Sequence, residues 1–145
     1  MSQKKVFITG ASQGLGQALS RHFSERGYFV YAGCFRKPAE LFGSGKVLQG
    51  DLTDPSAIER LFTEIDHLDV MVNNARFDPS KKPADIAESD WWDRNIEGSL
   101  KSTYLCTLAA FDKMKDRKIG AIVNVSSIRG VLPNDFDRIP YGAAK

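Results

Sequence analysis

The sequence predicts an α/β protein in which helices flank a parallel sheet, and three observations support this prediction. Short runs rich in β-branched and aromatic residues alternate with longer amphipathic segments, as they do where a helix connects each strand to the next. The strand-like runs are apolar throughout, as burial on both faces requires. The chain has 145 residues, of which 42% are hydrophobic and 26% charged. This composition is typical of one soluble globular domain, expected over residues 1–145.

Five strands and three helices are expected. The strands are predicted at residues 4–9, 28–34, 46–49, 69–73 and 121–125. The first helix ends at Gly27, which suits the left-handed position after a helix, and the second opens at Asp54 and Pro55, since proline is tolerated at the first helical position. The third begins near residue 89, after a surface loop predicted over residues 76–88. The apolar residues at helical spacing, expected to be buried, are Leu15, Ala18, Leu19 and Phe23, then Ile58, Leu61, Phe62 and Ile65, then Trp92, Ile96, Leu100, Tyr104 and Leu108.

Composition also excludes several function classes. The 20 Lys and Arg residues against 18 Asp and Glu give a net charge of +2, and the basic run at residues 113–118 is interleaved with acid, which favours a solvated helix end over a nucleic-acid surface. The longest apolar runs are strand-sized, so we expect neither a membrane span nor a signal peptide, and a cytoplasmic protein. Cys34 and Cys106 match no metal-ligand spacing, which predicts small buried residues and no metal site.

The first strand runs through three glycines into the first helix. Gly10, Gly14 and Gly16 lie in the segment at residues 6–16, and glycine lets a backbone approach a pyrophosphate closely. The helix amino terminus adds unpaired N–H groups and a partial positive charge. A tight turn alone is the simpler alternative, but the strand before and the helix after favour nucleotide binding.

This spacing, Thr-Gly-x-x-x-Gly-x-Gly, resembles that of the short-chain dehydrogenases/reductases. Four further segments agree with the resemblance in order along the chain: residues 51–54 (Asp-Leu-Thr-Asp), residues 73–75 (Asn-Asn-Ala), residues 124–127 (Asn-Val-Ser-Ser) and residues 141–145 (Tyr-Gly-Ala-Ala-Lys). The resemblance implies a Rossmann-like, doubly wound parallel sheet with strand order 3-2-1-4-5, truncated after the fifth strand. The residues that it implies for cofactor binding are Gly10, Ser12, Gln13, Gly14, Leu15, Gly16, Asp51, Leu52, Asn73, Ala75, Tyr141 and Lys145.

The resemblance also implies the catalytic residues. Tyr141 would give a proton to the developing alkoxide of a carbonyl substrate, and Lys145, one turn along the same helix face, would favour the phenolate and bind the nicotinamide ribose. Ser127 would hold the substrate oxygen. Without the upstream motifs the simpler alternatives would be favoured, namely an amphipathic surface residue for Tyr141, a disordered chain end for Lys145 and a helix cap for Ser127.

The choice of cofactor depends on the end of the second strand. A carboxylate that binds the ribose 2′-hydroxyl of NAD is expected there, but Cys34 occupies the position. Arg36 and Lys37 follow, and an arginine can bind a 2′-phosphate through two hydrogen bonds. NADP is therefore favoured over NAD, the alternative being that both cations are plain loop residues.

Three features depart from the family pattern. Ser99 stands where the fourth catalytic residue, an asparagine, is expected, so Ser99 is its candidate replacement. Arg76 replaces the glycine after Asn-Asn-Ala, beside the expected nicotinamide path; it would point to solvent, crowd the cofactor or meet an acidic group of the substrate. The family's members also run to roughly 250 residues as single domains.

The length suggests an incomplete domain. With the last strands missing, we expect little or no turnover from these 145 residues and an open edge on the fifth strand, which invites pairing with another chain. The resemblance implies a small carbonyl or alcohol substrate, and the sequence leaves its identity open, together with the question of a homo-oligomer. The alternative function is a non-catalytic nucleotide-binding or interaction module.

Overall fold

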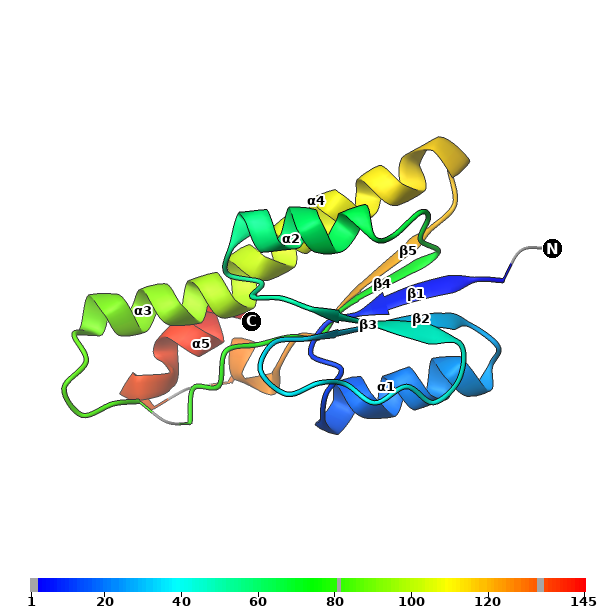
Figure 1. Ribbon diagram of the computed structural model, residues 1–145. Coiled ribbons are helices and arrows are strands. Elements are labelled where there is room, and N and C mark those ends of the chain that lie inside the picture. The colour runs from blue at the N-terminus through cyan, green and yellow to red at the C-terminus, as the bar shows by residue number, and fades with distance from the viewer. Residues whose placement is uncertain (1–2, 81, 133–134) are drawn as a thin grey trace.

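The computed structural model describes residues 3–80, 82–132 and 135–145. Its helices and strands follow the predicted alternation (Figure 1). The strands are β1 (Lys5–Ile8), β2 (Phe29–Cys34), β3 (Gly45–Gln49), β4 (Val70–Asn73) and β5 (Ala121–Asn124). The helices are α1 (Gly14–Glu25), α2 (Pro55–Thr63), α3 (Glu88–Ile96), α4 (Ser102–Met114) and α5 (Ile139–Ala144), with a π-helical turn η1 (Glu97–Lys101) between α3 and α4 and short 3₁₀ turns η2 (Lys115–Arg117), η3 (Ile128–Gly130) and η4 (Phe136–Arg138).

The five strands form one parallel sheet in the order β3-β2-β1-β4-β5. Helix α1 lies on one face of the sheet, and α2 and α4 lie on the other (Figure 1). This arrangement confirms the predicted Rossmann-like α/β fold and its strand order. The order reverses between β1 and β4, because the chain leaves β3 and crosses over β1 to form β4. Ligands of such sheets bind at this reversal, beyond the carboxyl ends of the strands.

The core consists of two apolar layers, one on each face of the sheet. On the face covered by α2 and α4, Phe7 packs edge-on against Phe62 at a ring-centroid distance of 5.4 Å. On the α1 face, the neighbouring residues Val6 and Ile8 pack with Phe23. Because successive side chains of a strand point to opposite faces, β1 needs an unbroken apolar sequence to fill both layers.

The predicted ends of two helices are confirmed. Gly27 follows α1 with φ +78°, in the left-handed region that only glycine adopts without strain. Asp54 caps α2, since its Oδ1 accepts a hydrogen bond of 2.9 Å from the Ser56 N–H, and Pro55 is the first residue of the helix. The expected apolar face of α2 is buried, including Ile58 and Phe62.

The predicted buried face of the third helix is wrong, and that of α1 is confirmed only in part. Along α3, η1 and α4, the residues Trp92, Leu100, Tyr104 and Leu108 are exposed and Ile96 is half-buried. In α1, Leu15 and Ala18 are exposed, whereas Leu19 and Phe23 are half-buried and pack against the core. The fully buried residues of α1 and α4 are mostly small: Gly16 and Ser20 in α1, and Ser102, Cys106 and Ala110 in α4, with Met114 at the end of α4. In α3 and η1 the buried residues are Trp91, Asn95 and Ser99.

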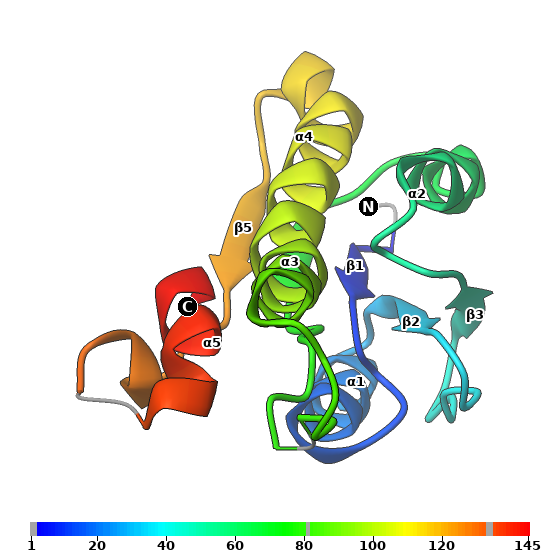
Figure 2. The ribbon, with the colours of Figure 1, turned by 90° about the vertical axis from the view of Figure 1, so that its left-hand side faces the viewer.

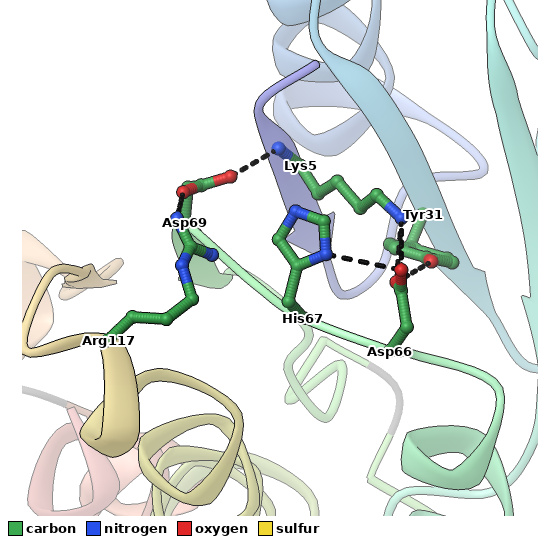
Figure 3. A network of polar contacts seen from close by, with 6 residues as sticks. All are labelled: Lys5, Tyr31, Asp66, His67, Asp69 and Arg117. Carbon is green, nitrogen blue, oxygen red and sulfur yellow. Dashed lines mark hydrogen bonds and ion pairs between the residues drawn. The ribbon is translucent and has the colours of Figure 1, made fainter. Parts of the chain in front are cut away.

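A charged network joins the amino-terminal ends of the strands (Figure 3). Asp69 lies just before β4 and accepts hydrogen bonds from the backbone N–H of Lys5, at 2.7 Å, and from Arg117, at 2.5 Å. The Lys5 ammonium reaches Asp66 at 2.7 Å, and the Tyr31 hydroxyl donates to the same carboxylate at 3.3 Å. These contacts tie together side chains from β1, β2, η2 and the segment before β4 at the amino-terminal end of the sheet. The reversal of the strand order, where a ligand is expected, faces the opposite, carboxyl end.

Candidate functional site

The three glycines after β1 are required for two different reasons. Gly10 and Gly14 have φ values of +67° and +54°, which L side chains rarely adopt. Gly16 is needed for close packing: a Cβ there would collide with the Gly10 carbonyl oxygen and lie 2.6 Å from Asn74 Nδ2. The chain therefore turns tightly between β1 and α1, and α1 begins at Gly14 with its backbone N–H groups facing the turn.

The segment after β4 braces this turn. The side-chain amide of Asn74 donates to the carbonyl oxygens of Thr9, at 2.9 Å, and Gly10, at 3.2 Å. In return, the Thr9 hydroxyl oxygen accepts hydrogen bonds of 3.0 Å from the backbone N–H groups of Asn74 and Ala75. Sequence reasoning missed both side chains, although Asn74 is the central residue of the Asn-Asn-Ala segment. They fix the glycine turn against β4.

A cavity of about 1120 Å³ opens at the carboxyl ends of the strands, where the strand order reverses. Its wall is formed in part by the glycine turn, in part by the segment after β4 and in part by helix α5. The residues predicted to bind the cofactor line it with the exception of Asn73: Gly10, Ser12, Gln13, Gly14, Leu15, Gly16, Arg36, Asp51, Leu52, Ala75, Tyr141 and Lys145. The exposure of Leu15, which the helical pattern did not predict, follows from its place in this wall.

Asn73 lies apart from this lining. Its buried amide nitrogen donates to Thr107 Oγ1 at 2.9 Å and to Asn124 Oδ1 at 2.8 Å, so that it joins β4 to β5 and α4. The residue holds the two strands in register beside the cavity.

The ends of β2 and β3 form the far side of the cavity. Cys34, the last residue of β2, is buried, and Arg36 and Lys37 follow it in the cavity wall. Asp51 follows β3, and its Oδ1 accepts hydrogen bonds from the Thr53 N–H, at 2.9 Å, and hydroxyl, at 2.8 Å. The carboxylate is thus held in one orientation, and it lines the same cavity as Arg36 and Lys37.

Tyr141 and Lys145 lie in the cavity wall formed by α5. Tyr141 is only 8% exposed, so it is not the solvated surface residue of the alternative interpretation. The Lys145 ammonium donates to the Val125 carbonyl oxygen at 2.8 Å, and the Lys145 carbonyl oxygen accepts from Ser126 Oγ at 2.9 Å. Burial lowers the pKa of the Lys145 ammonium, and the positive charge of Arg76 lowers it further.

Contacts of Asp137, just before α5, fix the position of this helix. The indole N–H of Trp91 in α3 donates to the Asp137 carbonyl oxygen at 2.7 Å, and the Lys82 ammonium reaches the Asp137 carboxylate at 2.8 Å. Asp137 belongs to η4, which leads directly into α5. Figure 2 shows α5 beside α3. These contacts hold α5, the short helix that carries Tyr141, against α3.

The two serines predicted to act in catalysis have other contacts. Ser127 Oγ accepts a hydrogen bond of 3.2 Å from the Arg129 N–H and caps η3, while its neighbour Ser126 lines the cavity. Ser99 is buried, and its Oγ accepts a hydrogen bond of 3.0 Å from the Phe77 N–H. Ser99 thus ties η1 to the segment after β4, and the catalytic roles of both serines stay predictions.

Two further features concern residues 3–80, 82–132 and 135–145 as a whole. Within these ranges, no group of three or more His, Cys, Asp or Glu side chains is close enough together to hold a metal ion. None of the helices in the same ranges is long and apolar enough to cross a bilayer. Both cysteines are buried, as expected, and burial raises the pKa of the Cys106 thiol to about 12.

Comparisons with known proteins agree with these features. The family described as short chain dehydrogenase matches residues 4–145. D-xylose 1-dehydrogenase of Caulobacter vibrioides is 35% identical over 151 residues, covering 98% of this chain and 60% of that protein. Two solved structures are each 28% identical to the chain: a metagenomic short-chain oxidoreductase in complex with NADP (TM-score 0.84, covering 98% of this chain and 70% of that one) and a closed form of serine dehydrogenase complexed with NADP+ (TM-score 0.81, 97% and 60%).

The chain spans about 60% of the length of the curated relative and of serine dehydrogenase. The family match nevertheless covers almost every residue, and it includes the glycine turn, the Asn-Asn-Ala segment and the final Tyr-x-x-x-Lys. The chain therefore belongs to the short-chain dehydrogenase family.

Proposed function

We propose that this chain is the cofactor-binding part of an NAD(P)-dependent oxidoreductase that interconverts a carbonyl compound and an alcohol. One observation carries the proposal: the glycine turn, Tyr141 and Lys145 line the same cavity. A nicotinamide cofactor supplies or accepts the hydride of such a reaction when it is bound. The chain's own residues have to bind the cofactor, orient the substrate and move one proton.

The residues of the cavity fit a dinucleotide. The glycine turn is a cradle that a Cβ at Gly16 would fill, and it lies at the amino terminus of α1, where backbone N–H groups favour a pyrophosphate. Asp51, fixed by Thr53, would accept a hydrogen bond from the adenine amine. Ala75 would lie along the remainder of the cofactor, with Asn73 supporting the strand that carries it.

The proton would come from Tyr141. The ammonium of Lys145, in the same cavity wall, would stabilise the negative charge that develops as the proton is transferred. Lys145 would also bind the nicotinamide ribose. Ser127 would hold the substrate oxygen after a rotation of its hydroxyl away from the Arg129 N–H.

NADP is the proposed cofactor. Arg36 and Lys37 lie in the cavity wall directly after β2, where they would neutralise a 2′-phosphate, and no carboxylate occupies the Cys34 position. The two solved relatives described above were crystallised with NADP or NADP+. We expect Arg36→Ala to weaken NADPH binding at least fivefold and to leave NADH binding within twofold. Equal effects on the two cofactors would contradict this choice.

Cofactor binding is tested by titrating the purified chain with NADPH and following the nicotinamide fluorescence. Gly14→Ala is the informative variant and Gly27→Ala its matched control, because both glycines have positive φ and open space where the Cβ would lie. Each substitution should destabilise the fold by about 1 kcal/mol. Only Gly14→Ala should weaken NADPH binding, at least tenfold. The proposal fails if the unaltered chain does not bind NADPH, or if both variants bind it equally weakly.

A second candidate function is nucleotide binding without catalysis, and the cap that Ser127 forms on η3 favours it. Turnover of a panel of ketones with NADPH separates the two functions. The expectation from the sequence is little or no turnover by this chain, compared with a version extended to the length of its relatives. Binding without turnover in the extended version would favour the second function.

A further inference from the structure

Arg76 is a cation in the cavity that the proposed roles do not use. It follows the Asn-Asn-Ala segment and lines the cavity together with Tyr141 and Lys145. Its guanidinium carbon lies 5.9 Å from the centre of the Tyr141 ring, within the range of a cation–π contact. The side chain is 48% exposed. The guanidinium therefore lies beside the proposed proton donor and within reach of a ligand.

The contacts of Arg76 with its own chain are weak. One terminal nitrogen, Nη1, donates to the Phe77 carbonyl oxygen at 3.3 Å and approaches Asp78 Oδ1 at 3.5 Å, the long limit for a hydrogen bond. The same Asp78 oxygen accepts from the Ser80 hydroxyl at 2.7 Å and the Ser80 N–H at 3.0 Å. These two Ser80 bonds are the main reason why the pKa of Asp78 is low, and Arg76 contributes less.

Arg76 and Lys145 line the same cavity. Burial lowers the pKa of the Lys145 ammonium, and the positive charge of Arg76 lowers it further. A bidentate carboxylate binds through two nitrogens of a guanidinium fork, whereas both chain contacts of Arg76 use a single nitrogen. An anion bound at Arg76 would relieve the repulsion between the cations.

We propose that Arg76 selects substrates that carry a carboxylate beside the reacting carbonyl, as in 2-oxo and 3-oxo acids. The guanidinium binds the carboxylate through two nitrogens, and the carbonyl oxygen then faces Tyr141. This inference rests on the proposed function, because it assigns a substrate class to the same site. The other source of an oxyanion in this cavity is a phosphate of the cofactor, and the experiment separates the two sources.

The test measures binding to the full chain saturated with NADP+, with which no net reduction of a ketone occurs. Pyruvate and acetoacetate are titrated against their neutral methyl esters by isothermal calorimetry. We expect at least one acid to bind ten times more tightly than its ester. In Arg76→Gln the ratio should fall to within twofold, and Arg76→Lys should retain part of it because it keeps the charge without the fork. The control is Arg94→Gln, which removes another arginine of the cavity wall and should keep the full ratio.

Three results overturn the inference. The first is equal affinity for acid and ester in the unaltered chain, and the second is a preference for the acid that survives in Arg76→Gln. The third is a loss of NADP+ affinity of fivefold or more in Arg76→Gln, which would assign Arg76 to the cofactor phosphates. The NADP+ affinity of the unaltered chain is measured first on the same sample. If the unaltered chain did not bind NADP+, the proposed function itself would be refuted. This result differs from one in which NADP+ binds and only the inference about Arg76 fails.

Discussion

Trp91 and Trp92 are the only tryptophans of the chain, and adjacent in it, yet their environments differ. Trp91 is fully buried, its ring contacts Phe77 edge-on at 5.4 Å, and its N–H donates to Asp137. Trp92 is 44% exposed. Removal of a buried tryptophan costs about 3–5 kcal/mol, so we expect Trp91→Ala to lower the free energy of unfolding by that amount. Trp92→Ala should cost about 2 kcal/mol, since only about half of its surface is buried and no enclosed cavity is left.

The assay is urea unfolding followed by far-UV circular dichroism, which does not depend on the tryptophans removed. Trp91→Phe keeps most of the ring and loses the hydrogen bond to Asp137, so it should cost about 1–2 kcal/mol. This variant keeps the test decisive if Trp91→Ala does not fold. A Trp92→Ala variant that is destabilised as much as Trp91→Ala, or more, would refute the assignment of the inward face of α3.

The remaining predictions concern stability and reactivity. Asp69→Ala should lower the free energy of unfolding by about 2–4 kcal/mol, because it removes a bond to a backbone N–H and one to an arginine, whereas Arg117→Ala should cost about 1 kcal/mol or less; equal losses in urea unfolding would contradict this. Burial raises the pKa of Asp69, but hydrogen bonds from Lys5 and Arg117 outweigh this effect and lower the pKa overall. The contribution of the Asp69 carboxylate to the free energy of unfolding is therefore complete above the unfolded-state pKa of about 4, and it is lost as the pH falls through the lower pKa of the folded state. An acid titration of Asp69→Asn should lack this loss of stability. Asn74→Ala should cost about 1–3 kcal/mol and weaken NADPH binding, and unchanged binding would refute the bracing role. The Cys106 thiol should not react with Ellman's reagent at pH 8 in the native protein and should react in 6 M guanidinium chloride, because burial both raises its pKa to about 12 and covers it; native reactivity in Cys34→Ser would contradict its burial.

The strand order and the glycine turn were predictable because their signals are local or belong to the family pattern. Gly10, Gly14 and Gly27 adopt positive φ values. Glycine is the residue that tolerates this conformation, so the turns could be anticipated from the glycines themselves. The apolar strands also predicted burial on both faces, which is confirmed for β1, β2 and β4 but wrong for β3 and β5, the two edge strands, whose residues are mostly exposed or half-buried. The alternation of such strands with helical segments leaves few alternatives to a parallel sheet.

The inward faces of α3 and α4, and half of that of α1, were not predictable from apolar spacing. A stripe of large apolar residues predicts burial only when the facing surface has room for it, and here the fully buried residues of α1 and α4 include Ser20, Ser102 and Ala110. The contacts of Ser99 and Ser127 were also beyond the sequence, because a hydroxyl chooses among neighbouring donors only once the backbone is placed. Asn74 was within reach, since the motif that contains it had been recognised.

The charged network and the cavity lie at opposite ends of the same strands. Lys5 and Asp69 stand where β1 and β4 begin, while Thr9 and Asn74 stand just beyond where those strands end. Substitutions at one end can therefore be chosen for resistance to heat, and those at the other for ligand preference, with each set expected to leave the other property in place. A designer who wishes to change the specificity of this scaffold has a separate set of positions with which to restore the stability lost.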